Sequence, residues 1–139
     1  MPPLTRWHIK SALVYFVAAL LAGLGLALRS VMELPSIVGA LAPVYFHLLM
    51  VGWVTQLIFG VAYWMFPRFS AEEPRGNEPL GWATCWLLNI GLVLRVIGEP
   101  LMTLQPNVIF GWVVVFSAAL QWLAGLGFVV NMWGRVKEK

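Results

Sequence analysis

His47 is the residue best placed for chemistry in this 139-residue chain, which contains two histidines, His8 and His47, and one cysteine, Cys85. It lies near the start of a nearly unbroken apolar run, 44–66, that is long enough to cross a bilayer. An ionisable side chain in such a run is costly without a partner, so it is a functional candidate by default. Its imidazole could be an axial ligand of haem iron, or it could hydrogen-bond to a carbonyl or water near the membrane surface. The single cysteine excludes an intrachain disulfide and an all-cysteine metal site.

Arg95 and Glu99 form a second candidate pair, four residues apart in another apolar run. On a helix this spacing allows an i,i+4 ion pair whose arginine extends to the membrane surface. The planar guanidinium of Arg95 could instead clamp a carboxylate such as a haem propionate. Met50, one turn after His47, is a further candidate for cofactor contact. The helical face that His47 shares is apolar and would accept a porphyrin or lipid: Met50, Val51, Val54, Ile58 and Met65.

The composition indicates which elements must position these residues. The chain is 60% hydrophobic and only 11% charged, so a soluble domain of this length could not bury its apolar surface. Four apolar runs are long enough to span a bilayer as helices, about 11–31, 42–66, 80–98 and 108–133. They do not alternate apolar with polar residues, as barrel strands do. The sequence therefore predicts a single all-α domain over 1–139, an integral membrane four-helix bundle.

The basic residues predict the orientation of these helices. Seven of them flank the spans on one side: Arg6, Lys10, Arg68, Arg75, Arg135, Lys137 and Lys139. Because basic residues favour the cytoplasmic side, both termini and the middle connection are predicted to be cytoplasmic, in a multi-pass protein of the cell inner membrane. The net charge of +3 is explained by this asymmetry and does not indicate nucleic-acid binding.

This orientation gives each candidate residue a depth in the membrane. His47 falls about one turn inside the outer boundary, and Arg95 falls at roughly the same level. His8 precedes the first span, so it is expected to be a solvated residue on the cytoplasmic side. The two histidines of one chain should therefore not share a metal. Two polar residues within spans, Asn89 and Gln121, are expected to make interhelical hydrogen bonds.

Small and polar residues recur every four positions in the second span, at Gly52, Gln56 and Gly60. This row lies on a different side of the helix from His47. Small residues allow another helix to approach closely, so the row predicts a helix-packing surface.

The segment "HLLMVGWVTQLIFGVAYWMFPR", residues 47–68, resembles the second transmembrane helix of subunit I in the haem-copper oxidase superfamily, especially its nitric-oxide-reductase and cbb3-like branches. The other three spans resemble that subunit more loosely, so the likeness extends to its first four transmembrane helices. The residues that carry the resemblance in the second span are His47, Gly52, Trp53, Gly60, Tyr63, Pro67 and Arg68.

The resemblance implies that His47 is an axial ligand of a low-spin haem b near the outer face. The family's catalytic centre requires several further histidines, whereas this chain has only His8 besides His47. We therefore expect no oxygen- or nitric-oxide-reducing activity. The expected function is a small b-type haem protein for electron transfer or gas binding, with a partner in the respiratory chain.

The sixth position of the iron has three candidate occupants. A homodimer could supply the second copy's His47 through a two-fold interface. A methionine could serve, either Met50 or one of Met32 and Met102 near the outer ends of their spans. The position could also stay open to a small gas. Two alternatives to haem remain, namely a haem-free accessory or structural membrane subunit and an outer-face copper or zinc site built from paired His47 residues.

Overall fold

The protein is all-helical over the residues that the computed structural model describes, 1–71 and 74–136. Four helical segments are long and apolar enough to cross a membrane, which makes the chain a multi-pass membrane protein. These segments are α1 (Pro3–Leu28), the continuous stretch Ala42–Met65, α5 (Glu78–Leu104) and α6 (Val108–Trp133). The stretch Ala42–Met65 is divided into α3 (Ala42–His47), the π-helix η1 (Leu48–Thr55) and α4 (Gln56–Met65), and the short helix α2 (Ser36–Ala40) precedes it.

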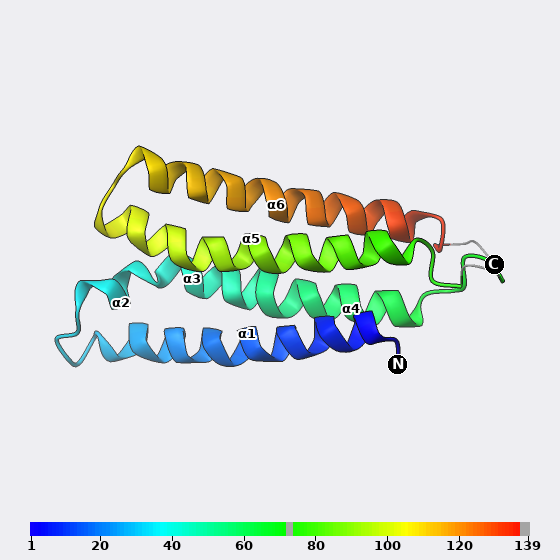
Figure 1. Ribbon diagram of the computed structural model, residues 1–139. Coiled ribbons are helices and arrows are strands. Elements are labelled where there is room, and N and C mark those ends of the chain that lie inside the picture. Colours follow the sequence, from blue (N-terminus) through cyan, green and yellow to red (C-terminus); the bar gives the residue numbers. More distant parts are fainter. Residues whose placement is uncertain (72–73, 137–139) are drawn as a thin grey trace.

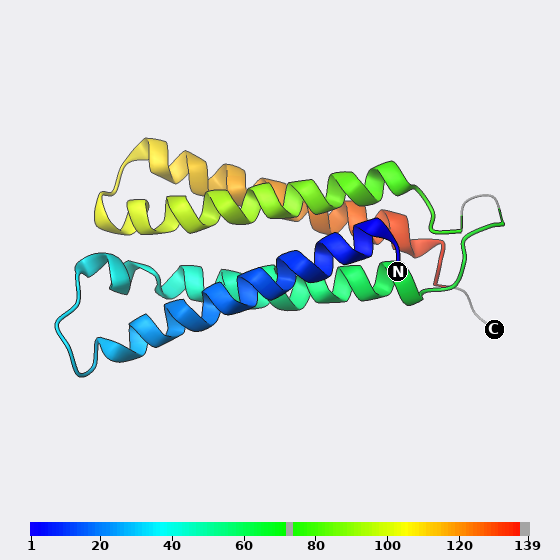
Figure 2. The same cartoon turned by 60° about the horizontal axis from the view of Figure 1, so that its bottom comes forward.

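The helices form two antiparallel hairpins (Figures 1 and 2). One hairpin pairs α1 with α3, η1 and α4, and the other pairs α5 with α6. The start of α1, the end of α6 and the connection between α4 and α5 lie at one end of the bundle (Figure 1). This common end agrees with the predicted topology, whose cytoplasmic assignment stays a prediction. Two of the basic residues behind that assignment, Lys137 and Lys139, lie outside the described residues.

The four predicted membrane-spanning helices are confirmed, but their bounds differ: α1 ends at Leu28 instead of residue 31, and two helices extend beyond the predicted spans. Helix α1 begins at Pro3, eight residues before the first apolar run, because proline is well suited to the first turn of a helix. Helix α5 continues through Pro100 to Leu104. Asn77 starts α5 by accepting a hydrogen bond from the Leu80 amide at 2.9 Å. A hydropathy window detects only the part of a helix inside the hydrocarbon, whereas the polar ends of a helix continue into the interface.

Glycines set the distance between α1 and the second span, as the four-residue row predicted. A Cβ atom on Gly52 would lie 2.7 Å from Cβ of Tyr15, and one on Gly60 would lie 2.9 Å from Cβ of His8. Gln56, between them, is fully buried. The row is therefore confirmed as a packing surface.

A buried arginine ties the ends of two helices together. Arg135 follows α6 and is only 1% exposed. Its Nη2 donates to the carbonyl oxygen of Phe66 at 2.8 Å and its Nε donates to that of Pro67 at 3.0 Å. Burial lowers the pKa of this guanidinium, which still stays charged. Arg135 thus provides hydrogen bonds to carbonyl oxygens that would otherwise be unpaired at the end of α4. From the sequence, Arg135 indicated only the topology of the chain.

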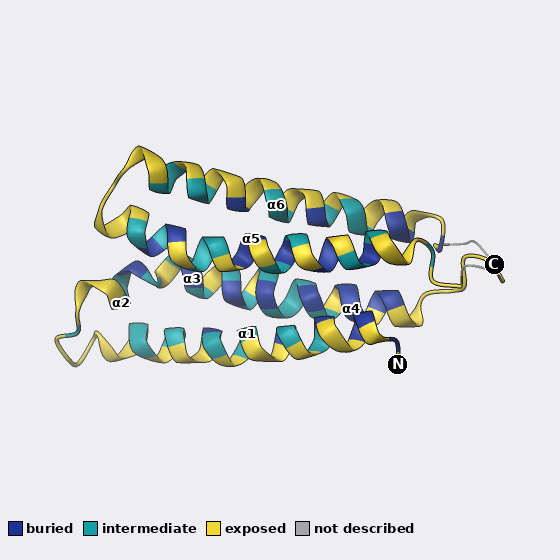
Figure 3. Ribbon diagram, in the orientation of Figure 1, coloured by how far each residue is buried: buried dark blue, intermediate teal, exposed yellow. Residues whose placement is uncertain are grey.

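The outward faces of the helices are exposed and apolar. Exposed residues cover the outer sides of α1 and α6, and buried residues follow the inner sides (Figure 3). Large apolar side chains such as Leu21, Trp122 and Val130 are among those exposed. Such a surface is stable against lipid and not against water.

Candidate functional site

His47 is the last residue of α3, at the junction with the π-helix η1. Its Nδ1 lies 3.0 Å from the carbonyl oxygen of Pro43. A carbonyl oxygen only accepts hydrogen bonds, so the hydrogen must be on Nδ1. In the neutral imidazole, Nε2 then carries a free lone pair, the form in which histidine binds metals. The side chain is 29% exposed, and Nε2 has no hydrogen-bond partner in the part of the chain that the structure describes.

Glu99, from α5, approaches the same side of the ring. Its Oε2 lies 3.3 Å from Nδ1 of His47, and its Oε1 lies 3.4 Å from Nη1 of Arg95. The i,i+4 pair predicted from the sequence is thereby confirmed, and so is the common level of Arg95 and His47. The arginine side chain is largely buried instead of extended to the surface. Its Nε has no hydrogen-bond partner among the described residues, so it is a free donor inside the bundle.

The π-helix changes the face that the sequence assigned to His47. Each turn of η1 contains more residues than an α-helical turn, so positions calculated with a 3.6-residue period shift after residue 47. Met50 is 54% exposed, and Ile58 and Met65 are exposed as well. These three residues, which were expected on the same face as His47, therefore belong to an apolar strip on the outward side of the second span. The Met50 side chain lies on this outward strip. The other two methionine candidates, Met32 and Met102, are also exposed.

The expectation that His8 is solvated at the membrane rim is wrong. Its side chain is only 3% exposed because α1 begins at Pro3 and already packs against α4 at this position. The His8 ring contacts the Phe59 ring edge-on, with 6.2 Å between centroids, and interacts with the side chain of Gln56. His8 and His47 remain in different parts of the bundle, since α3 and the start of α1 lie near opposite ends (Figure 1).

A buried polar cluster links three helices in the interior. Asn89 of α5 accepts hydrogen bonds at its Oδ1 from Tyr15 Oη at 3.0 Å and from Gln56 Nε2 at 3.1 Å. Its Nδ2 donates to the carbonyl oxygen of Cys85 at 2.8 Å. The predicted interhelical role of Asn89 is confirmed. The contribution of Tyr15 was missed, although its position seven residues after His8 places both on one face of α1.

The fourth span makes its interhelical hydrogen bond through a different residue from the one predicted. Ser117 Oγ donates to the carbonyl oxygen of Gly91 in α5 at 2.7 Å. Gln121 Nε2 in turn donates to Ser117 Oγ within its own helix, at 3.2 Å. Ser117 makes this bond instead of Gln121 because α6 approaches Gly91 closely. The short serine side chain can therefore reach the backbone of α5 directly.

Within the described residues, no cluster of three or more histidine, cysteine, aspartate or glutamate side chains could hold a metal ion. His47 and Glu99 are the two metal-binding side chains that lie together. His47 could hold a haem as a single ligand, whereas a bare metal ion held by one chain needs about three or four ligands.

No protein-family model, curated protein or solved structure matches the chain.

Proposed function

We propose that this protein is a small membrane haem b protein in which His47 Nε2 is an axial ligand of the iron. The observation that carries the proposal is the position of Nδ1, which donates to the Pro43 carbonyl and lies beside the Glu99 carboxylate. Metal-binding histidines typically use their second nitrogen in this way, which fixes the tautomer and the ring orientation. The resemblance of residues 47–68 to a haem-binding helix supports the same assignment.

Glu99 and Arg95 would tune and anchor the group. The carboxylate beside Nδ1 increases the basicity of the imidazole and stabilises positive charge on it. Arg95 compensates the charge of Glu99, and its guanidinium is of the type that binds a propionate. When bound, haem would supply one-electron transfer or a coordination position for a small gas. No catalytic residue is assigned, and the proposed roles are electron transfer to a respiratory-chain partner and gas binding.

A homodimer would enclose the haem. One bundle leaves the His47 side chain partly exposed beside an outward apolar strip that includes Phe46, Met50 and Ile58. A second copy related by a two-fold axis would cover this strip, and its His47 could help to hold the same haem. Met50 of the second copy is the alternative to its His47 as the second ligand. With both termini cytoplasmic, this site faces the outer leaflet of the inner membrane.

Haem content of the purified protein tests the proposal. Protein expressed with sufficient haem should show a Soret band and a pyridine haemochrome spectrum of haem b. His47→Ala should lose both. His8→Gln is the matched control, because it removes the other imidazole, keeps a polar group beside Gln56 and should retain the haem. Full haem in His47→Ala, or a folded wild type that stays colourless, would contradict the assignment.

Glu99→Gln tests whether Glu99 tunes the reduction potential of the haem or only packs beside His47. The variant keeps the side-chain volume and removes the negative charge near Nδ1. We expect it to retain haem and to show a higher reduction potential, since the ferric state loses a stabilising anion. An unchanged potential would remove Glu99 from the site.

Stoichiometry and elemental analysis decide between the remaining arrangements. One haem for two chains, with the spectrum of bis-histidine ligation, would support a shared iron. One haem for each chain would contradict sharing. Copper or zinc in His47-dependent amounts without porphyrin would replace the haem proposal with the paired-histidine metal site.

A further inference from the structure

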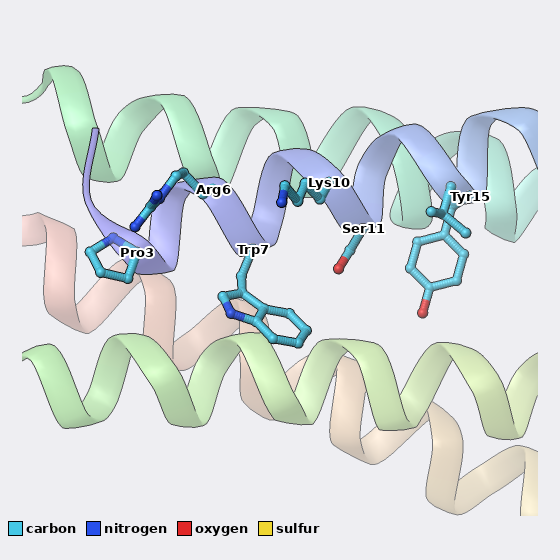
Figure 4. A pocket seen from close by; sticks show the side chains of 7 residues that line it. Pro3, Arg6, Trp7, Lys10, Ser11 and Tyr15 are labelled. Atoms are coloured by element: carbon cyan, nitrogen blue, oxygen red, sulfur yellow. The ribbon is translucent and has the colours of Figure 1, made fainter.

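A cavity of about 540 Å³ opens along the first half of α1, at the end of the bundle where the termini lie (Figure 4). It is separate from His47, which is carried by α3 near the opposite end of the bundle (Figure 1). The residues that give it chemical character are Arg6, Trp7, Lys10, Ser11 and Tyr15. The side chains of Trp7, Ser11 and Tyr15 point from α1 towards α5, whereas Arg6 and Lys10 lie along α1 itself (Figure 4), so the cavity is a groove along α1.

The groove changes from cationic to apolar along its length. Arg6 and Lys10 are four residues apart on one face of α1, about 6 Å apart along the helix axis. Both are exposed, and neither has an acidic partner within the described part of the chain. The hydroxyl of Ser11 follows, and then Val14 and the ring of Tyr15. Two uncompensated cations beside an apolar channel match an anion attached to a hydrocarbon chain.

A tryptophan cluster places the groove at the membrane interface. The ring of Trp7 packs edge-on against Trp82 of α5, with 6.4 Å between centroids, and is tilted against Trp86, at 6.1 Å. Tryptophans prefer the level of the lipid headgroups. The cations of the groove therefore lie where phospholipid phosphates lie, and its apolar part lies where their acyl chains begin.

We propose that this groove is a binding site for one anionic phospholipid. Its phosphate sits between Arg6 and Lys10, its glycerol backbone contacts Ser11, and one acyl chain runs past Val14 towards Tyr15. The bound lipid lies along α1, beside the contact that Trp7 makes with Trp86 of α5. A soluble phosphate would satisfy the two cations but would leave the apolar half of the groove unfilled, so a lipid is the occupant that matches the whole groove.

Quenching of tryptophan fluorescence by brominated lipids tests this site in the full-length protein. The chain is reconstituted in phosphatidylcholine vesicles that contain either phosphatidylglycerol or additional phosphatidylcholine with brominated acyl chains. We expect stronger quenching by brominated phosphatidylglycerol at equal mole fraction. Trp86→Phe should reduce this excess, because it removes a reporter beside the groove.

Charge variants identify the headgroup contacts. Arg6→Gln and Lys10→Gln should each weaken the preference for phosphatidylglycerol by about fivefold, and the double variant by about 25-fold, as expected for one surface cation each. Arg75→Gln is the matched control, since it removes an exposed basic residue outside the groove. It should change the preference less than either groove variant does. Circular dichroism confirms that each variant is folded.

Three outcomes would overturn the proposal. The first is equal quenching by the two brominated lipids. The second is an effect of Arg75→Gln as large as that of Arg6→Gln, which would indicate general surface charge. The third is loss of the preference when inorganic phosphate is added at constant ionic strength, which would show that the site takes a free anion and not a lipid.

Discussion

Gly52→Ala tests the packing that holds the second span against α1 and α5. The new Cβ would lie 2.7 Å from Cβ of Tyr15 and 2.9 Å from Cδ2 of Leu92. The leucine methyl can move, but Cβ of Tyr15 is attached directly to the backbone of α1. To reach the ordinary contact range, which begins at 3.4 Å, α1 and η1 must separate by about 0.7 Å. This movement would also stretch the 3.0 Å hydrogen bond between Tyr15 and Asn89.

The expected cost follows from two opposing effects. Overpacking of this kind costs about 1–3 kcal/mol. Replacing glycine by alanine inside a helix contributes up to about 1 kcal/mol in the other direction. We therefore expect Gly52→Ala to lower the free energy of unfolding by about 1–2 kcal/mol. Gly125→Ala is the matched control, because no atom lies within 4 Å of its new Cβ. It should leave stability unchanged or raise it by up to about 1 kcal/mol.

Unfolding in mixed micelles of a mild detergent and sodium dodecyl sulfate, followed by far-ultraviolet circular dichroism, measures both variants. The packing argument requires Gly52→Ala to unfold at a lower dodecyl sulfate fraction than the wild type and Gly125→Ala. A Gly52→Ala variant as stable as the wild type would refute it. Equal destabilisation of both variants would also refute it, since the effect would then not depend on the contact with Tyr15.

Three further predictions use the same unfolding assay. Asn89→Leu should lower the free energy of unfolding by about 1–2 kcal/mol, because it leaves the Tyr15 hydroxyl and the Gln56 amide without their shared acceptor; an unchanged stability would argue against the cluster. Arg135→Lys should cost about 2 kcal/mol, since an ammonium keeps the charge but cannot reproduce the two separate guanidinium bonds to carbonyls where α4 ends; a fully stable lysine variant would contradict that role. Ser117→Ala should cost about 0.6 kcal/mol, the average for one interhelical hydrogen bond in a membrane, and a cost of several kcal/mol would point to a larger function for Ser117.

The sequence was sufficient for features that depend on run length and on helical rise. Apolar runs of about 20 residues must become helices in a bilayer, because the backbone has no other way to satisfy its hydrogen bonds there. Counting residues along antiparallel helices then placed Arg95 at the level of His47, and the 3.3 Å and 3.4 Å contacts through Glu99 agree with that count. The glycine row in the second span was recognisable for a similar reason, since only small residues allow close helix contact.

Residues near the ends of helices were predicted less well. His8 was predicted to be solvated at the membrane rim, and Arg135 was used only as a topology signal, yet both are buried. Their environment depends on which helix packs beside them, and hydropathy contains no information on that choice. The π-helix η1 also could not be predicted from the sequence, because residues 48–55 are as compatible with an α-helix as the residues around them.

The sequence by itself therefore determined the class of the protein, the number of its spans and the common level of His47 and Arg95, because those follow from the length of the apolar runs and the rise of a helix. Tertiary structure decided which side of His47 meets a carboxylate, that Asn89 joins three helices, and that the basic start of α1 lines a cavity. These arrangements are set by close contacts between helices distant in the chain, and a one-dimensional pattern of apolar and polar residues does not specify such contacts.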